Sequence, residues 1–270
     1  MKKFLFILIA FHILFVAIGN TLSAEIAWMH VQHREYGEGK SLNRLGFGLV
    51  DDQIQYITDD ATVKDMTLYD PNGKPVKLSP HRFGNVFEIY GTYDSKNSQW
   101  LYNKSWQFDS WFSVDILTSL IPGVYRLKVT TTDGKVAERA YPFNKRVVLP
   151  VIDSGSMQLQ PDPYGNLIWT WQIPAELARL SFNHKTRARA SIDIYKDKKN
   201  IAYFSIILPV HMGYALIPND VVQKLNQKAG RLELKVSLET RDKNNRTYSK
   251  PYVVDNLPTK SSLASASKKD

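Results

Sequence analysis

Apolar residues recur at every second position through most of the chain after residue 24, which is the spacing of β-strands with one buried face. Between residues 124 and 131, Tyr125, Leu127 and Val129 alternate with charged or polar residues. Asp133-Gly134 follows and leads into a second alternating run, which predicts a β-hairpin because both residues tolerate positive φ. The chain is therefore expected to be all-β.

The first half of the chain resembles an immunoglobulin-like β-sandwich. The resemblance rests on the run Pro122-Gly123-Val124-Tyr125-Arg126-Leu127, in which a turn leads into a strand with an inward tyrosine. The late strands of the immunoglobulin fold have this pattern. A second turn, at residues 70–73, separates two short apolar runs and indicates another pair of antiparallel neighbours.

The second half has three more alternating strands. Their buried positions are Leu167, Trp169, Trp171 and Ile173; Ala188, Ala190, Ile192 and Ile194; and Leu232, Leu234, Val236 and Leu238. The intervening positions are expected to be solvated: Arg187, Arg189, Ser191 and Asp193 on one strand, and Arg231, Glu233, Lys235 and Glu239 on another. A short helix is expected over residues 219–228, capped by Asn219 or Asp220.

Residues 156–256 resemble a fibronectin type III domain. The motifs that carry the resemblance are Trp-x-Ile-Pro at 171–174, the apolar strand that ends at Tyr195, Leu225 ahead of Gly230, the alternating strand 231–239, and Tyr248-Ser249-Lys250-Pro251. This resemblance implies a second antiparallel sandwich. We therefore expect two tandem β-sandwich domains, at residues 25–146 and 157–256, with a linker at 147–156 and a disordered tail at 257–270.

Residues 1–24 have the pattern of a secretory signal peptide. Two lysines precede an apolar run from Phe4 to Ile18, and a small residue, Ala24, stands at the expected cleavage site. A retained membrane anchor is the alternative, but the run is slightly short for a bilayer and His12 interrupts it. The sequence thus predicts an exported protein, periplasmic or extracellular, with no stable transmembrane segment after processing.

Composition narrows the classes of function. The hydrophobic fraction of 43% is large enough for the chain to form a buried core and fold. The absence of cysteine excludes disulfides and thiol chemistry. The net charge of +9 suits polyanionic surface polymers, which a basic exported protein meets before nucleic acid, so no nucleic-acid partner is expected. No cofactor is expected. A metal site at His30 and His33 is not expected either, because a separation of three on a strand puts them on opposite faces.

The segment from Trp100 to Phe112 is dense in aromatic residues. Most of them are expected to fill a sandwich core, with Phe108 and Phe112 buried together. Trp111 has the opposite parity and is expected to turn outward, away from that core, as an exposed indole. Trp111, Trp100 and Tyr93 are therefore the candidate ligand-binding residues.

Lys185, Arg187 and Arg189 form the densest basic surface. A solvated strand face that discourages aggregation is one interpretation, and an anion-binding patch is the other. Four carboxylates, Glu88, Asp94, Asp109 and Asp115, cannot be placed by sequence. The motifs of common hydrolases and phosphate loops are absent, so no catalytic residue is predicted.

The function most consistent with this pattern is an exported, non-enzymatic binding or structural module, because tandem sandwiches present their faces and loops to other molecules. Its expected partner is another exported protein or a cell-surface polymer. The alternatives are a carbohydrate-binding accessory protein with an aromatic platform, and a hydrolase that lacks a recognisable local motif.

Overall fold

A computed structural model describes residues 24–51, 53–57, 59–179, 186–228 and 230–259. The expected all-β class is confirmed, because these residues form sixteen strands and only short helices. The predicted signal peptide, apart from Ala24, lies outside the described residues, as do Lys185 and the tail from residue 260. No helix in the described part of the chain is long and apolar enough to span a membrane.

The strands and helices occur along the chain in the following order. The first half contains β1 (Glu25–Tyr36), β2 (Lys40–Val50), the 3-10 turn η1 (Asp60–Thr62), β3 (Val63–Tyr69), β4 (Arg82–Asp94), β5 (Gln99–Tyr102), β6 (Gln107–Ile116), β7 (Gly123–Thr131) and β8 (Val136–Phe143). The second half contains η2 (Ser154–Ser156), β9 (Gln158–Pro161), β10 (Leu167–Thr170), α2 (Ala175–Arg179), β11 (Thr186–Lys196), β12 (Lys199–Pro209), β13 (Tyr214–Ile217), α3 (Asn219–Gln227), β14 (Arg231–Thr240), β15 (Asn245–Tyr248) and β16 (Tyr252–Val254).

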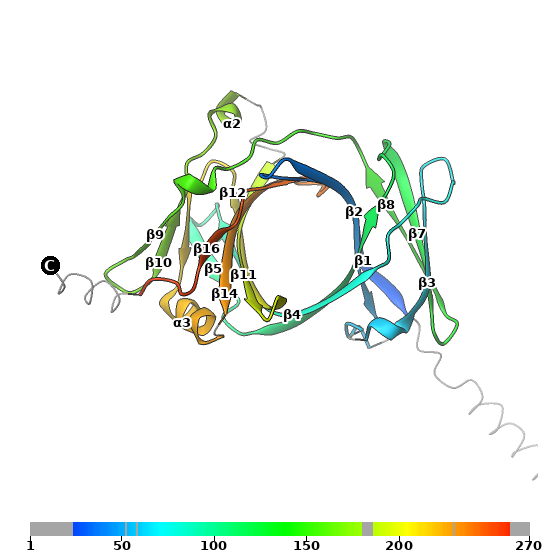
Figure 1. The fold of residues 1–270 in the computed structure, drawn as a ribbon, viewed down its shortest axis with the longest axis horizontal. Coiled ribbons are helices and arrows are strands. Elements are labelled where there is room, and N and C mark those ends of the chain that lie inside the picture. Colours follow the sequence, from blue (N-terminus) through cyan, green and yellow to red (C-terminus); the bar gives the residue numbers. More distant parts are fainter. Residues whose placement is uncertain (1–23, 52, 58, 180–185, 229, 260–270) are drawn as a thin grey trace, which may run out of the picture.

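Eight strands close into a barrel, in the order β11-β12-β4-β6-β2-β1-β15-β14, with β14 pairing back to β11 (Figure 1). Each half of the chain contributes four neighbouring strands. The halves meet at two parallel pairings, β12 with β4 and β1 with β15, whereas the other pairings around the barrel are antiparallel. The sheet of the first half and the sheet of the second half are therefore one continuous surface.

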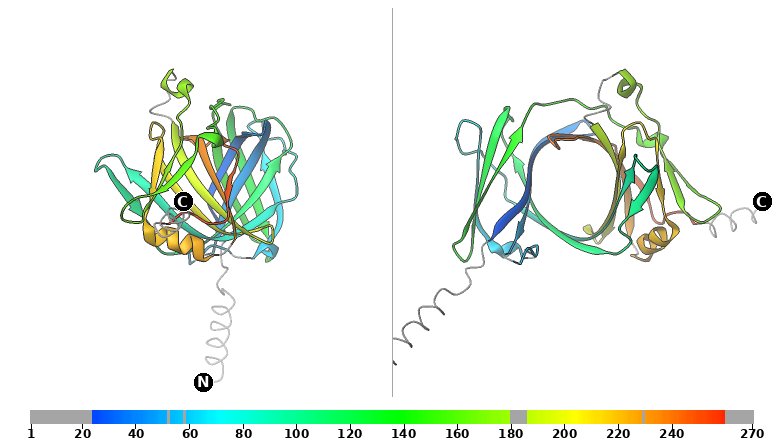
Figure 2. Two further views of the ribbon diagram at one scale, coloured as in Figure 1. Left: turned by 60° about the vertical axis from the view of Figure 1, so that its left-hand side comes forward. Right: turned by 180° about the vertical axis from the view of Figure 1, so that it is seen from behind.

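A three-stranded sheet covers each half of the barrel from outside. Sheet β3-β7-β8 lies against the first half and sheet β9-β10-β13 against the second, on opposite sides of the barrel (Figures 1 and 2). One apolar core fills each interface; Phe47, Phe112 and Tyr125 belong to the first, and Trp169 and Phe204 to the second. Two layers thus exist in each half, but the expectation of two separate tandem sandwiches needs correction, because their inner sheets merge.

Local predictions are confirmed in the first half. Strands β7 and β8 form the expected hairpin, in which Gly134 has a φ of +84°. Tyr125 is buried, and the Ile121 N–H donates to its Oη at 3.0 Å, the type of tyrosine contact found in immunoglobulin-like sandwiches. Phe112 is buried as expected, but Phe108 is 44% exposed and packs edge-on against Phe87. The prediction that Phe108 is buried was wrong, because Phe108 lies outside the first core.

The second half also follows its apolar pattern. The three predicted strands form, and α3 buries Val221, Val222 and Leu225. Pro218, rather than Asn219 or Asp220, occupies the N-cap of α3, and it makes no side-chain cap hydrogen bond. The predicted linker contains no strand, but it buries Leu149 and Ile152 in the second core, so it is packed against the second half along part of its length.

The closed sheet makes a prediction about the two halves in isolation. A chain of residues 25–146 would leave the edges of β1 and β4 unpaired, and one of residues 147–259 would leave those of β12 and β15 unpaired. Open edges pair with other chains. Each half expressed alone should aggregate, and the two co-expressed should give a soluble 1:1 complex on size-exclusion chromatography. A soluble monomer of either half with a cooperative melt would show that the halves fold independently.

Candidate binding pocket inside the barrel

The inner face of the barrel is polar. Residues such as Ala188 and Leu238 of strands β11 and β14 point outward into the second core, so the residues between them point inward. These inward residues include Arg187, Arg189 and Glu239, and the expectation that they form a solvated outer face was wrong. Glu239 is only 2% exposed, because closure of the sheet puts its carboxylate inside.

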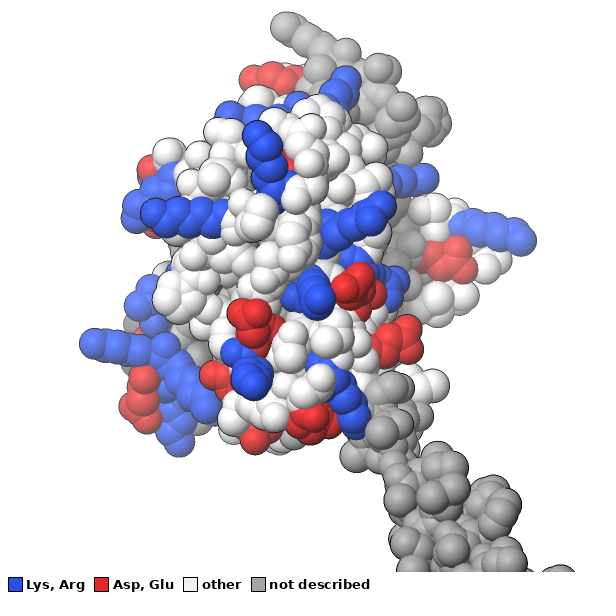
Figure 3. Space-filling model, turned by 90° about the vertical axis from the view of Figure 1, so that its right-hand side faces the viewer, with Lys and Arg blue, Asp and Glu red and all other residues white. Residues whose placement is uncertain are grey.

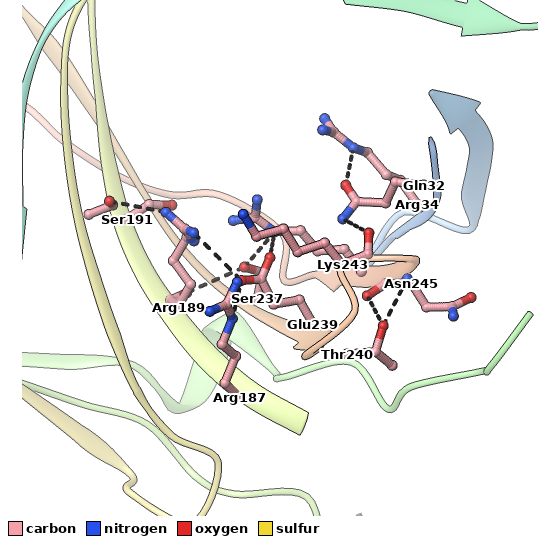
Figure 4. Close-up of polar contacts among 12 residues, drawn as sticks. Gln32, Arg34, Arg187, Arg189, Ser191, Ser237, Glu239, Thr240, Lys243 and Asn245 are labelled. Carbon is pink, nitrogen blue, oxygen red and sulfur yellow. Dashed lines mark hydrogen bonds and ion pairs between the residues drawn. The ribbon is translucent and has the colours of Figure 1, made fainter. Parts of the chain in front are cut away.

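A row of charged residues crosses four neighbouring strands on this inner face. Arg34 of β1 is opposite Arg246 of β15, Arg246 is opposite Glu239 of β14, and Glu239 is opposite Arg187 of β11. Arg189 stands one inward position further along β11, and Lys243 lies in the turn between β14 and β15. We call Arg34, Arg187, Arg189, Lys243 and Arg246 the cationic cluster; Figure 4 labels the first four of them.

Glu239 is the carboxylate at the centre of the cationic cluster. Its Oε1 lies 2.6 Å from Arg187 Nε and 3.5 Å from Arg189 Nη2, and its Oε2 lies 3.8 Å from Arg246 Nε. Burial alone would raise the pKa of Glu239, but the three guanidinium groups outweigh it and lower the pKa to about 2. Glu239 is thus held ionised at any ordinary pH.

The cationic cluster carries more positive charge than Glu239 balances. This excess contributes to the pKa shifts of neighbouring titratable groups. Burial, reinforced by Arg34, Lys243 and Arg246, lowers the pKa of His30 to about 3. Burial and the nearby Arg187 lower the pKa of Lys243. The pKa of the Tyr248 hydroxyl is also lowered, although burial alone would raise it, because Arg246 and Arg34 favour the phenolate. The shift of Tyr248, which runs against the effect of burial, indicates a positive potential inside the barrel, and the cationic contributions to the shifts of His30 and Lys243 have the same sign.

The cationic cluster also has unused hydrogen-bond donors. Buried Arg187 Nη2 and Arg189 Nε have no hydrogen-bond partner among the described residues. Arg34 donates through Nε to the neutral Gln32 Oε1 at 2.7 Å, and within the described part of the chain it pairs with no carboxylate. Buried donors without acceptors cost folding free energy, about 1–3 kcal/mol each. These arginines therefore have donors that an incoming acceptor can use.

A cavity of about 530 Å³ opens at the end of the barrel where β1 and β15 finish. Its lining includes Arg34 and Arg246 of the cationic cluster and four tyrosines, Tyr36, Tyr195, Tyr203 and Tyr248. Six lysines and arginines line it against two acidic residues. Strands from both halves contribute, so the cavity exists only in the closed barrel. We call it the mouth pocket.

Tyrosine rings and ion pairs fix the walls of the mouth pocket. The rings of Tyr36 and Tyr248 stack with centroids 5.0 Å apart, and the Arg246 guanidinium lies over the Tyr248 ring at 4.5 Å. Lys235 Nζ is held by Asp193 at 3.0 Å and by Glu233 at 2.9 Å. Burial opposes the charge on Lys235, but Asp193 and Glu233 raise its pKa. Lys235 is thereby neutralised locally, whereas Arg34 is not.

One outer side of the protein lacks this imbalance. Figure 3 shows the side covered by sheet β3-β7-β8, where positive and negative side chains are interspersed. Lys128 and Glu138, for example, are paired across β7 and β8 at 3.9 Å. This mixture of charges is typical of a solvated surface and contrasts with the excess of cations inside the barrel.

Trp111 also faces the interior of the barrel. Trp111 lies on the opposite face of β6 from Phe112, as predicted. That face is the inside of the barrel, however, and the side chain is half-buried there instead of exposed on an outer surface. The indole lies flat against Gly84 of β4, where an added Cβ would approach it to 2.6 Å. Trp28 and His30 cover Gly48 and Gly46 of β2 in the same way.

The other predicted site residues are placed apart from Trp111. Tyr93 and Trp100 are cross-strand partners with ring centroids 4.9 Å apart, and Trp100 also meets Tyr214. Both are half-buried against the second core, outside the barrel. Arg187 and Arg189 come together in the cationic cluster, while Lys185 lies outside the described residues. Whether any of them binds a ligand stays a prediction.

Comparisons with known proteins add little at this point. No protein-family model and no curated protein matches this chain. Among solved structures, the FN1–FN3 domains of chicken CNTN1 match over 90% of this chain and 69% of that one, at 9% sequence identity and a TM-score of 0.30. That likeness is too low to bear on function.

Sequence reasoning missed Arg34, Arg246, Tyr36 and Tyr248. Their convergence depends on the pairing of β1 with β15, two segments far apart in the sequence. The one available signal was a surplus of arginines at polar positions of predicted strands. Strand alternation alone does not distinguish an outer face from the inside of a barrel.

Trp111 and Trp169 should respond differently to truncation. Trp169 is fully buried in the second core, so Trp169→Ala should lower the free energy of unfolding by about 3–5 kcal/mol. Trp111 is half-buried against Gly84, and Trp111→Ala should cost roughly half of that or less. Urea denaturation of both variants measures the difference. Equal losses would mean that Trp111 is as much a core residue as Trp169.

Acid should destabilise the protein through His30. The folded state resists protonation of His30 down to a pKa of about 3, whereas the unfolded chain takes up the proton near the ordinary value of 6.5. Stability is therefore fully present above pH 6.5 and is lost as the pH falls, by about 2 kcal/mol between pH 7 and 5. His30→Gln should remove most of that loss.

Urea midpoints at pH 7 and 5 test this expectation, with the exposed His211→Gln as the matched control. The contribution of Glu239 is lost at lower pH, between its ordinary pKa of 4.5 and about 2, and so falls outside this window. An unchanged pH dependence in His30→Gln would show that another group causes the loss.

Proposed function

We propose that this chain is an exported, non-enzymatic binding module that holds a small ligand in the mouth pocket. The observation that carries the proposal is the pocket itself: strands of both halves line it, tyrosines and arginines wall it, and its volume of about 530 Å³ suits a small molecule. Export rests on the signal-peptide pattern of residues 1–24.

The chemistry of the pocket favours recognition over catalysis. The stacked pair Tyr36 and Tyr248 and the ion-paired Lys235 are held in place by neighbouring side chains. Glu88 and Asp109 have raised pKa values, mainly because of burial, and would be the natural proton donors. Neither is among the residues that line the mouth pocket. The groups available to a ligand there are fixed donors and ring faces.

A carbohydrate ligand is the second candidate, and one observation supports it. Four tyrosines line the mouth pocket, and sugar rings commonly pack on aromatic faces. In this version the aromatic platform is Tyr36 and Tyr248 inside the pocket, instead of Trp111, Trp100 and Tyr93. A binding role toward another exported protein or a surface polymer is compatible with the same pocket if a side group of that partner enters it.

Retention of a ligand by the protein tests the proposal. The protein is purified from the exported fraction under mild conditions, and the small molecules released on denaturation are measured by mass spectrometry. Tyr36→Ala removes one wall of the mouth pocket, and Tyr164→Ala, at an 85% exposed loop position, is the matched control. Wild type and Tyr164→Ala should release the same compound, and Tyr36→Ala should release at least about fivefold less.

Two results would contradict the proposal. Equal release from all three proteins would place the ligand elsewhere. Turnover of the released compound on incubation with the purified protein would show that the chain is an enzyme.

A further inference from the structure

The uneven charge of the barrel interior specifies the ligand further. Three of the five cations in the cationic cluster, Arg187, Arg189 and Arg246, lie within 3.8 Å of one carboxylate, Glu239, whereas Arg34 and Lys243 have no ion pair with a carboxylate among the described residues. The other nearby acids already have partners or are remote. Asp193 and Glu233 hold Lys235, and Glu38, the second acid that lines the mouth pocket, pairs with Lys40 at 3.5 Å. Glu88 approaches Arg189 only through Ser205. Burying like charges this close is unfavourable, so an anion that entered would be stabilised by their field.

We infer that the mouth pocket binds a small ligand through an oxyanionic group, a carboxylate or a phosphate, which pairs with Arg34 and Arg246. This inference rests on the proposed function and deepens it. Arg34 and Arg246 are the members of the cationic cluster that line the mouth pocket, and they stand opposite one another on β1 and β15. Two guanidinium groups side by side match the paired oxygens of a carboxylate or phosphate.

The surroundings of Arg34 make it the leading contact. Its partners are neutral: Gln32 Oε1 at 2.7 Å, His30 Nε2 at 3.5 Å, and the ring of Tyr248, whose centroid is 5.9 Å from Cζ. The low pKa of His30 keeps that imidazole uncharged, so it does not supply a competing cation or require a carboxylate. Arg34 contacts no group of opposite charge in the described part of the chain, and an oxyanion in the mouth pocket would supply one.

Arg246 supplies the second contact and connects the mouth pocket to the deeper cations. Its Nε donates to Ser237 Oγ at 3.0 Å and lies 3.8 Å from Glu239, while its guanidinium covers the Tyr248 ring. Behind it, Arg187 and Arg189 keep buried donors without partners. These deeper charges raise the potential at Arg246 without needing to touch the ligand.

Matched probes distinguish an anionic ligand from a neutral sugar. Galacturonate and galactose differ in one carboxylate, and inorganic phosphate presents the oxyanion alone. Isothermal calorimetry at low chloride should detect binding of galacturonate and phosphate to the wild-type protein, with affinities that fall as chloride rises. Galactose should bind at least about tenfold more weakly than galacturonate.

Variants locate the site. Arg34→Gln should weaken binding of both anions by about tenfold or more, and Arg34→Lys by less, because lysine retains the charge but not the paired donors. Arg126→Gln, an exposed position on β7, removes the same charge elsewhere and should leave the affinity unchanged. Should Arg34→Gln fail to fold, Arg34→Lys compared with Arg126→Gln still decides the point.

Glu239→Gln gives an independent readout. Loss of the central carboxylate increases the charge excess, so the variant should melt at a lower temperature in chloride-poor buffer and recover more than the wild type on addition of phosphate. An equal response of both proteins to phosphate would overturn the inference.

The outcomes separate this inference from the proposed function. Equal affinity for galactose and galacturonate would leave the binding module in place but overturn the anionic ligand. Anion binding that Arg34→Gln leaves intact would overturn the assigned site. The proposed function itself fails if the mouth-pocket variant Tyr36→Ala retains as much of the compound as the wild type, or if the purified protein turns that compound over.

Discussion

Closure of the inner sheet is the constraint on which the molecule depends. Two parallel strand pairs, β1 with β15 and β12 with β4, join the halves into a barrel. In an open arrangement, the polar face of each four-stranded sheet would be hydrated and its charges screened. In the barrel the same face is enclosed, so interactions among its charges strengthen and any imbalance becomes costly. The strand pairing thus converts an ordinary polar face into a strongly polarised interior.

The interior combines groups that stabilise the fold with groups that strain it. Glu239 offsets the charge of three arginines, and its lowered pKa shows how strongly they favour its ionised form. Arg34 has no such counterpart among the described residues, and two other arginines keep buried donors unpaired. Binding sites often retain uncompensated groups at some expense in stability. The apolar cores outside the barrel, around Trp169 and Phe112, supply stability independently of this arrangement.

Much of the local structure was predictable from the sequence, because alternation and turn chemistry act over short distances. The β7–β8 hairpin, the buried Tyr125 and the buried face of β14 follow from neighbouring residues alone. The barrel does not, since no short-range pattern shows that β1 pairs with β15. For the same reason, Arg187 and Arg189 were correctly grouped on one face of a strand, but that face was wrongly expected to be on the outside. Arg34 and Arg246 were missed. Trp111 was correctly placed on the face opposite Phe112, but the expectation that this face is an exposed outer surface was wrong, because it is the inside of the barrel.

The pairing of β1 with β15 also sets the order of events during folding. Gln32 Nε2 donates to the Lys243 carbonyl across 211 residues of sequence, so β1 acquires its second neighbour only after β15 has been synthesised. Contacts of such sequence separation slow folding, because the entropy of closing a long loop must be offset first. Until then β1 presents an unpaired edge, and the nascent protein depends on protection from association with other chains. A truncation anywhere before residue 245 would abolish the barrel, however much of the remaining sequence is intact.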